Sequence, residues 1–103
     1  MPDEDLTGAC RRILRAAVAG RVQGVGYLDW ACGQAEALGL EGFVRNRASG
    51  EVEIVLAGPA DAVALMCERL WRGPPAARVA SIALFEADET ALGAGGFLRL
   101  PTI

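Results

Sequence analysis

Short apolar runs alternate along this chain with longer stretches that have a helical repeat of apolar positions. Residues 13–19 (ILRAAVA) are apolar and end at Gly20, which predicts a buried strand. From Tyr27 onward, apolar side chains recur every three or four residues, with polar positions between them. Gly39 is a typical helix stop, so the pattern predicts an amphipathic helix over 27–38.

The middle of the chain predicts a hairpin followed by a second helix. GFVRN (42–46) and EVEIVLAG (51–58) resemble strands, and the turn between them places Gly50 where a positive φ is needed. Pro59 is expected near the first position of the second helix, with Asp61 in its first turn. The Gly-Pro-Pro run that starts at Gly73 ends this helix.

Two more strands are predicted, at 79–87 and 97–100, separated by a loop over 88–96. The order is therefore β-α-β-β-α-β with a short strand added. This order predicts an α+β, ferredoxin-like split βαβ (βαββαβ) fold, in which two helices cover one face of an antiparallel sheet. Residues 1–10 are acidic and aperiodic, so we expect a flexible leader there and a single domain over 11–103.

The composition disfavours several classes of partner. The 103 residues are 52% hydrophobic, and the net charge of −3 repels nucleic acids and acidic membrane surfaces. The predicted central strands also lack the aromatic side chains on which RNA bases stack. No apolar run approaches the roughly 20 residues that span a bilayer, and the acidic start does not resemble a secretory signal. We expect a cytoplasmic monomer with no nucleic-acid or membrane partner.

The residue types also limit the chemistry. The chain has no histidine, which excludes Ser-His and Cys-His nucleophile pairs and imidazole acid/base catalysis. Cys10, Cys32 and Cys67 are widely spaced and form no C-x-x-C pair, so they predict neither a disulfide framework nor a zinc site. We expect no metal and no cofactor. Acidic residues such as Glu51 and Glu53 are expected on the solvated surface.

The loop GRVQGVGY, residues 20–27, is the strongest candidate for a binding site. Glycines at 20, 24 and 26 permit a positive φ, so that consecutive amides could point into one concavity at the start of the 27–38 helix. Such a concavity attracts an anion, above all a phosphate group. A glycine-rich tight turn that binds nothing has the same spacing, and the spacing alone does not separate the two.

GRVQGVGY resembles the signature of the acylphosphatase family, in which a basic residue and V-Q-G-V precede a variable position, an aromatic and an arginine. GFVRN, 42–46, is similar to the family's G-[WF]-V-x-N block. The hairpin glycine and valine and the Gly-Pro before the second helix agree as well. The resemblance extends from about residue 12 to residue 100, with gaps only in the 88–96 loop.

This resemblance implies hydrolysis of the carboxyl–phosphate anhydride in small acyl phosphates, without metal or cofactor. The loop would hold the phosphoryl group, and the asparagine Asn46 would orient the attacking water. The substrate-binding residues implied in this way are Arg21, Val22, Gln23, Gly24, Val25 and Gly26. Phosphoryl transfer depends mostly on positioning and electrostatics, so a chain without histidine is chemically adequate. Without the loop beside it, Asn46 would equally be a turn former.

The sequence departs from the family pattern at Leu28, where the family has its phosphate-binding arginine. Arginines that stabilise phosphoryl transfer are worth roughly 10³ to 10⁵ in rate. Hydrolysis should therefore be weak or absent unless another arginine reaches the site. Arg21 is nearest along the chain, while strand alternation should direct Arg45 and Arg47 to the face opposite Asn46.

The leucine at position 28 is also compatible with two different roles for the protein. Helical spacing fits a leucine that packs on the apolar side of the 27–38 helix. The protein would then be a noncatalytic module that binds phosphate, sulfate or another protein. Alternatively, Leu28 is an introduced change in an otherwise active enzyme.

Overall fold

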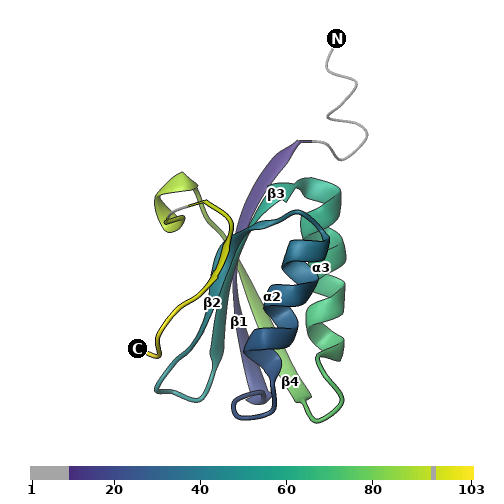
Figure 1. The fold of residues 1–103 in the computed structure, drawn as a ribbon, viewed down its shortest axis with the longest axis vertical. Helices are drawn as coiled ribbons and strands as arrows, with labels where there is room; N and C mark the ends of the chain where they lie inside the picture. The colour runs from purple at the N-terminus through teal and green to yellow at the C-terminus, as the bar shows by residue number, and fades with distance from the viewer. Residues whose placement is uncertain (1–9, 94) are drawn as a thin grey trace.

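The computed structural model describes residues 10–93 and 95–103, which form one sheet with two helices packed on the same face (Figure 1). The strands are β1 (Arg11–Arg21), β2 (Glu41–Asn46), β3 (Val52–Pro59), β4 (Arg78–Glu86) and β5 (Phe97–Arg99). The helices are α2 (Tyr27–Ala37), α3 (Ala60–Arg72) and the 3₁₀ turn η1 (Glu89–Ala91). Neither α2 nor α3, nor any other helix of the described residues, is long and apolar enough to cross a bilayer. The expected leader over 1–10 lies outside the described residues except for Cys10.

The sheet has the strand order β4-β1-β3-β2-β5. β1 pairs antiparallel with both β3 and β4, and β2 pairs antiparallel with β3. β5 is added at the edge beside β2 and runs parallel to it. The predicted ferredoxin-like α+β fold is therefore confirmed, including the short strand at its end.

Strand β1 is longer than the apolar run predicted. It continues through Gly20 to Arg21, and its pairing with β4 shifts register between Ala19 and Gly20. Gly20 has φ +131°, and a Cβ at this position would lie 2.2 Å from the carbonyl oxygen of Arg78. Gly20 is thus required by the bulge between two strands rather than by a ligand. The connection to α2 is the shorter segment 22–26.

Two smaller differences concern turns. Pro59 is the last residue of β3 and caps α3 in an extended conformation, rather than occupying a position inside the helix. The loop expected over 88–96 contains η1, whose cap is Asp88, because the Asp88 side chain accepts a hydrogen bond from the amide of Thr90. Asp61 lies in the first turn of α3, as predicted.

The main core lies between the sheet and the two helices. On α3 the core includes Val63, Met66 and Leu70, with the partly buried Cys67 packed against it. Tyr27, at the start of α2, is 1% exposed and donates a hydrogen bond of 2.6 Å to the carbonyl oxygen of Leu70. This bond joins the beginning of α2 to the end of α3. It satisfies a buried hydroxyl that would otherwise destabilise the core.

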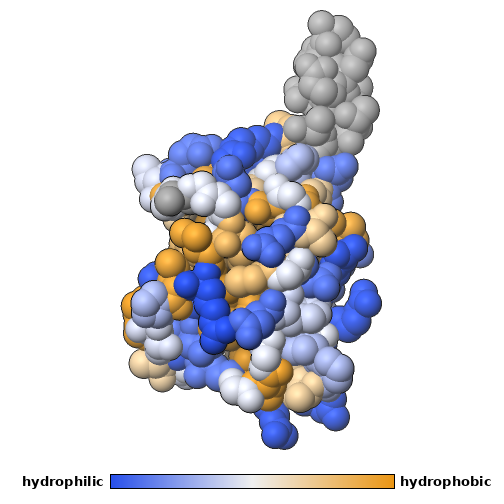
Figure 2. Space-filling view, in the orientation of Figure 1, coloured by the Kyte–Doolittle hydropathy of each residue, from blue (hydrophilic) through white to orange (hydrophobic). Residues whose placement is uncertain are grey.

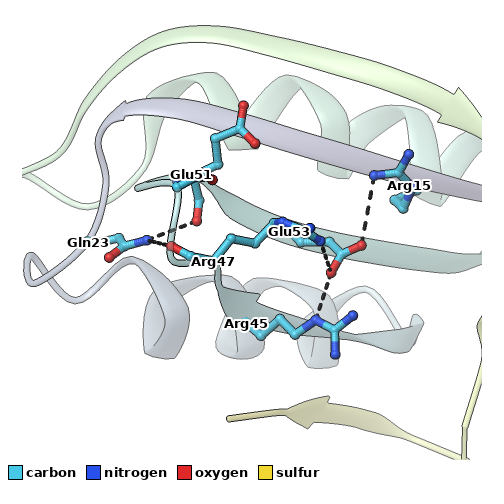
Figure 3. A network of polar contacts seen from close by, with 7 residues as sticks. Arg15, Gln23, Arg45, Arg47, Glu51 and Glu53 are labelled. Carbon is cyan, nitrogen blue, oxygen red and sulfur yellow. Dashed lines mark hydrogen bonds and ion pairs between the residues drawn. The ribbon is translucent and has the colours of Figure 1, made fainter. Parts of the chain in front are cut away.

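The other face of the sheet carries a buried carboxylate, which corrects the expectation of a solvated Glu53. Glu53 is 5% exposed because it lies on the central strand β3, and arginines from β1 and from the β2 side surround it (Figure 3). Its oxygens lie 2.7 Å from Arg45 Nε, 3.3 Å from Arg47 Nη1 and 3.8 Å from Arg15 Nη1. A buried charge is tolerated when it is paired in this way.

Glu53→Gln should lower the free energy of unfolding by about 1–3 kcal/mol, because it removes the charge that three partly exposed arginines share. Glu51→Gln is the matched control: Glu51 is two residues away, and among the described residues its side chain makes no ion pair. Urea unfolding of both variants measures the difference. Equal stabilities would mean that the Glu53 cluster contributes nothing beyond a surface pair.

Burial raises the pKa of Tyr27 above the usual value near 10. The phenol ionises near pH 10 in the unfolded chain and stays neutral in the folded protein, so its contribution to stability is complete below about pH 10 and is lost as the pH rises further. Tyr27 is the only tyrosine, so the phenolate absorbance reports on it alone. We expect no phenolate in the folded protein at pH 10, and a steeper alkaline loss of stability than in Tyr27→Phe. A phenolate signal at pH 10 before unfolding would contradict the burial argument.

Candidate functional site

A pocket lies where segment 22–26, the first turn of α2 and the ends of β2 and β5 come together. Its lining residues are Val22, Gly24, Gly26, Tyr27, Leu28, Asp29, Asn46 and Arg99. Its volume of about 170 Å³ is below the roughly 300–1,000 Å³ of sites for drug-sized ligands. The pocket therefore suits a small group, and its walls come from three separate parts of the sequence.

Two glycines give the segment 22–26 its shape. Gly24 has φ +75° and Gly26 has φ +84°, and a Cβ at either position would meet no atom within 4 Å. The requirement is thus conformational and not steric, since an L side chain in this region costs roughly 1–2 kcal/mol. No residue other than glycine has a positive φ in the described part of the chain. The segment ends are fixed by Val22 and Tyr27, each 1% exposed.

The main-chain amides of this segment have no acceptors in the part of the protein that the structure describes. Within residues 10–93 and 95–103, no amide from Gln23 to Asp29 donates a hydrogen bond to another protein group. The first amide of α2 that does so belongs to Trp30, which donates to the carbonyl oxygen of Gly26 at 3.0 Å. Free N–H groups at the positive end of a helix dipole favour an anion.

The Gln23 side chain ties this segment to the β2–β3 hairpin. Its Nε2 donates to the carbonyl oxygens of Arg47 at 2.8 Å and Glu51 at 3.0 Å (Figure 3). Gln23 does not line the pocket, and its side chain holds the loop beside the end of β2. The sequence pattern singled out Gln23 as part of the loop, but it did not predict this tether.

Asn46 is the last residue of β2 and lines the pocket together with Gly24 and Gly26. Its Oδ1 is shielded from solvent and has no hydrogen-bond partner among the described residues. An unsatisfied buried acceptor costs about 1–3 kcal/mol. The carboxamide is thus a polar group at the pocket wall with its acceptor unused, which is unlike the locally bonded asparagine of an ordinary turn.

The arginines considered from the sequence lie elsewhere. Arg21 is exposed at the end of β1, in register with Arg78, and does not line the pocket. Arg45 and Arg47 approach Glu53 on the face opposite Asn46, which confirms the prediction from strand alternation. Val25 is half-buried and packs against the core.

Leu28 is 8% exposed, belongs to the main core and also forms part of the pocket wall. Leu28 therefore packs against the core, which is the role that its helical spacing is compatible with.

Arg99 is a lining residue that the sequence pattern did not reveal. It lies on β5 opposite Val44 of β2, and its guanidinium forms an ion pair with Asp29 in the first turn of α2. Figure 2 shows strongly hydrophilic side chains between the C-terminal strand and α2, beside hydrophobic surface. Alternation from Phe97, which enters the core, could have predicted that Arg99 faces the helices.

Cys32 and Cys67 are not activated nucleophiles. Burial, and then the nearby carboxylates of Glu36 and Asp29, raise the pKa of Cys32 above its ordinary value. Burial raises the pKa of Cys67 as well. Thiols with a raised pKa stay protonated at neutral pH and react slowly. Among the described residues, no group of three or more His, Cys, Asp or Glu side chains is arranged to hold a metal ion.

Known proteins share both the sequence pattern and the fold. The acylphosphatase family model matches residues 14–97. The chain is 51% identical over 89 residues to an acylphosphatase of Rhizorhabdus wittichii, which covers 86% of this chain and 88% of that protein. It is 46% identical over 85 residues to an acylphosphatase of Rhizobium meliloti, with coverage of 82% and 90%.

A solved acylphosphatase structure from Coxiella burnetii superposes with a TM-score of 0.80 at 32% identity, covering 87% of this chain and 93% of that one. The family match spans most of the chain and includes the pocket loop, the β2–β3 hairpin and Asn46. This chain therefore belongs to the acylphosphatase family.

Proposed function

We propose that this protein hydrolyses the carboxyl–phosphate anhydride of small acyl phosphates, at a rate lowered by the leucine at position 28. The observation that carries the proposal is the meeting of Gly24, Gly26 and Asn46 in one pocket, with unused amides on the loop and an unused acceptor on Asn46. We further propose that the protein acts as a cytoplasmic monomer and that the reaction needs neither a metal nor a cofactor.

In the proposed reaction, the loop amides hold the oxygens of the phosphoryl group. The Asn46 carboxamide hydrogen-bonds a water molecule and directs its oxygen at phosphorus. The bond between phosphorus and the bridging oxygen breaks as the new P–O bond forms. The products are a carboxylate and inorganic phosphate, and the proton of the water passes to solvent. Catalysis comes from positioning and from donors that face the developing charge.

The substitution at position 28 limits this chemistry. An arginine donates two parallel hydrogen bonds and keeps its positive charge as the phosphoryl oxygens gain negative charge, whereas leucine does neither. Losing one preorganised donor costs roughly 10² to 10³ in rate. The loop amides and the helix dipole keep part of the phosphate binding, so binding should be weakened less than turnover.

The burial of Leu28 favours a second candidate function, a noncatalytic module that binds phosphate or a phosphorylated partner. Leu28 packs in the core at 8% exposure, as expected if position 28 has become part of the packing. The two functions differ in turnover but share the anion pocket.

Asn46→Ala should lower kcat for acetyl or benzoyl phosphate by at least ~10²-fold and change KM only a few-fold, because the side chain orients water and does not bind the phosphoryl group. Ser49→Ala, at an exposed position of the same hairpin, is the control and should keep wild-type rates. An unchanged kcat in Asn46→Ala would exclude the proposed role of Asn46 in orienting the attacking water. Wild-type protein that binds phosphate and never turns over would support the noncatalytic candidate.

Titration with inorganic phosphate should shift the amide NMR signals of residues 23–29 saturably, and the affinity should fall as salt concentration rises. Gly26→Ala should weaken this binding, since alanine at φ +84° strains the loop. Gly33→Ala lies within α2 with open space and no positive φ, so it should leave binding unchanged. Equal affinity in the two variants would show that the loop conformation does not make the site.

A further inference from the structure

We propose that Arg99 supplies the guanidinium that position 28 lacks, and that it holds the phosphoryl group from β5 instead of from α2. This inference rests on the proposed function, because it assigns a residue to the same pocket. It predicts an enzyme whose phosphate-binding arginine comes from the last strand of the sheet.

The first support is position. Arg99 lines the same pocket as Gly24, Gly26 and Asn46. Its Nη1 contacts the carboxylate of Asp29, which is the residue next to Leu28 in the first turn of α2. The guanidinium therefore lies beside the first turn of α2, which it reaches from the β5 side of the pocket.

The second support is the backbone that positions Arg99. Arg99 pairs with Val44, and by strand alternation Val44 and Asn46 share one face of β2. Main-chain bonds continue beyond Arg99, from the Leu100 amide to the Val44 carbonyl at 2.9 Å and from the Ile103 amide to the Asn46 carbonyl at 3.2 Å. The two polar residues are thus carried by paired main chain on the same side of the sheet.

The third support is the availability of the charge. The Arg99 and Asp29 side chains are 53% and 77% exposed, and an exposed pair of this kind contributes only about 0–1 kcal/mol. A phosphoryl group offers Arg99 stronger, bidentate and charge-assisted bonds. Exchange of Asp29 for the substrate is therefore favourable. Arg99 is the one arginine among the described residues that lines this pocket.

The test compares Arg99→Met with Arg12→Met. Arg12, near the start of β1, also forms an exposed ion pair, in this case with Glu86. The Arg12 and Glu86 side chains are 45% and 72% exposed, and Arg12 does not line the pocket. The two variants change the net charge equally and each removes one surface pair. We expect Arg99→Met to lower kcat/KM for benzoyl phosphate by ~10² or more and to weaken the binding of inorganic phosphate. Arg12→Met should keep both values and should have the same thermal midpoint as Arg99→Met.

Two further variants separate phosphate binding from a structural role. Arg99→Lys keeps the charge without the planar fork and should recover only part of the lost rate. Arg99→Met combined with Leu28→Arg returns a guanidinium from the helix side and should recover activity. Asp29→Asn should raise kcat/KM, because it removes the carboxylate that competes with the substrate for Arg99. A loss in Asp29→Asn as large as in Arg99→Met would overturn the inference, since the ion pair itself would then be what matters.

The remaining outcomes distinguish this inference from the proposed function. If the wild type is active and Asn46→Ala is inactive, but Arg99→Met equals Arg12→Met, the inference is overturned and the proposed function stands. Activity that appears only when Leu28→Arg is introduced overturns the inference and favours the noncatalytic candidate for the wild type. If neither the wild type nor Leu28→Arg hydrolyses benzoyl phosphate, the proposed hydrolysis fails, and the inference that rests on it fails too.

Discussion

The site depends on a loop whose amides have no acceptors among the described residues and must nevertheless be held in place. Each such donor is a liability in a folded protein unless water or a ligand satisfies it. The loop is fixed at its ends by Val22 and Tyr27 in the core, and at its middle by the two hydrogen bonds of Gln23. Glycines at 24 and 26 provide the backbone conformation without strain. The stabilising contacts thus lie around the loop and leave its donors unused.

The Gln23 tether also couples the loop to the asparagine. Its acceptors are carbonyl oxygens on both sides of the hairpin turn, and one of them belongs to Arg47, the residue after Asn46. A neutral hydrogen bond contributes about 0.5–1.5 kcal/mol to stability, so two of them fix the separation between loop and hairpin appreciably. One side chain thus helps to set the distance between the loop amides and the proposed water-orienting group. The proposed reaction needs such a tether, because small displacements cost large factors in rate.

Local pattern predicted those parts of the structure that depend on neighbours in sequence. The glycine spacing predicted positive φ at 24 and 26, and alternation predicted that Arg45 and Arg47 face away from Asn46. It failed where register between distant strands decides the outcome. Glu53 is buried on the central strand β3 with Arg45 directly opposite it on β2, and nothing in the EVE stretch indicates that register. Arg99 was missed for the same reason, since the three residues of β5 do not indicate by themselves that they pair in parallel beside β2.

A motif assigns an arginine to a place along the chain, whereas a phosphoryl group responds only to where the guanidinium lies in space. Position 28 faces both the core and the pocket, so its side chain is 8% exposed. Burying a leucine there contributes about 1.5–3 kcal/mol, while an arginine in the same place must desolvate part of its charge. In the proposed arrangement these demands are separated: Leu28 packs the start of α2, and Arg99 brings the charge from an exposed strand. The helix start gains packing, and the charge stays hydrated until a substrate replaces Asp29.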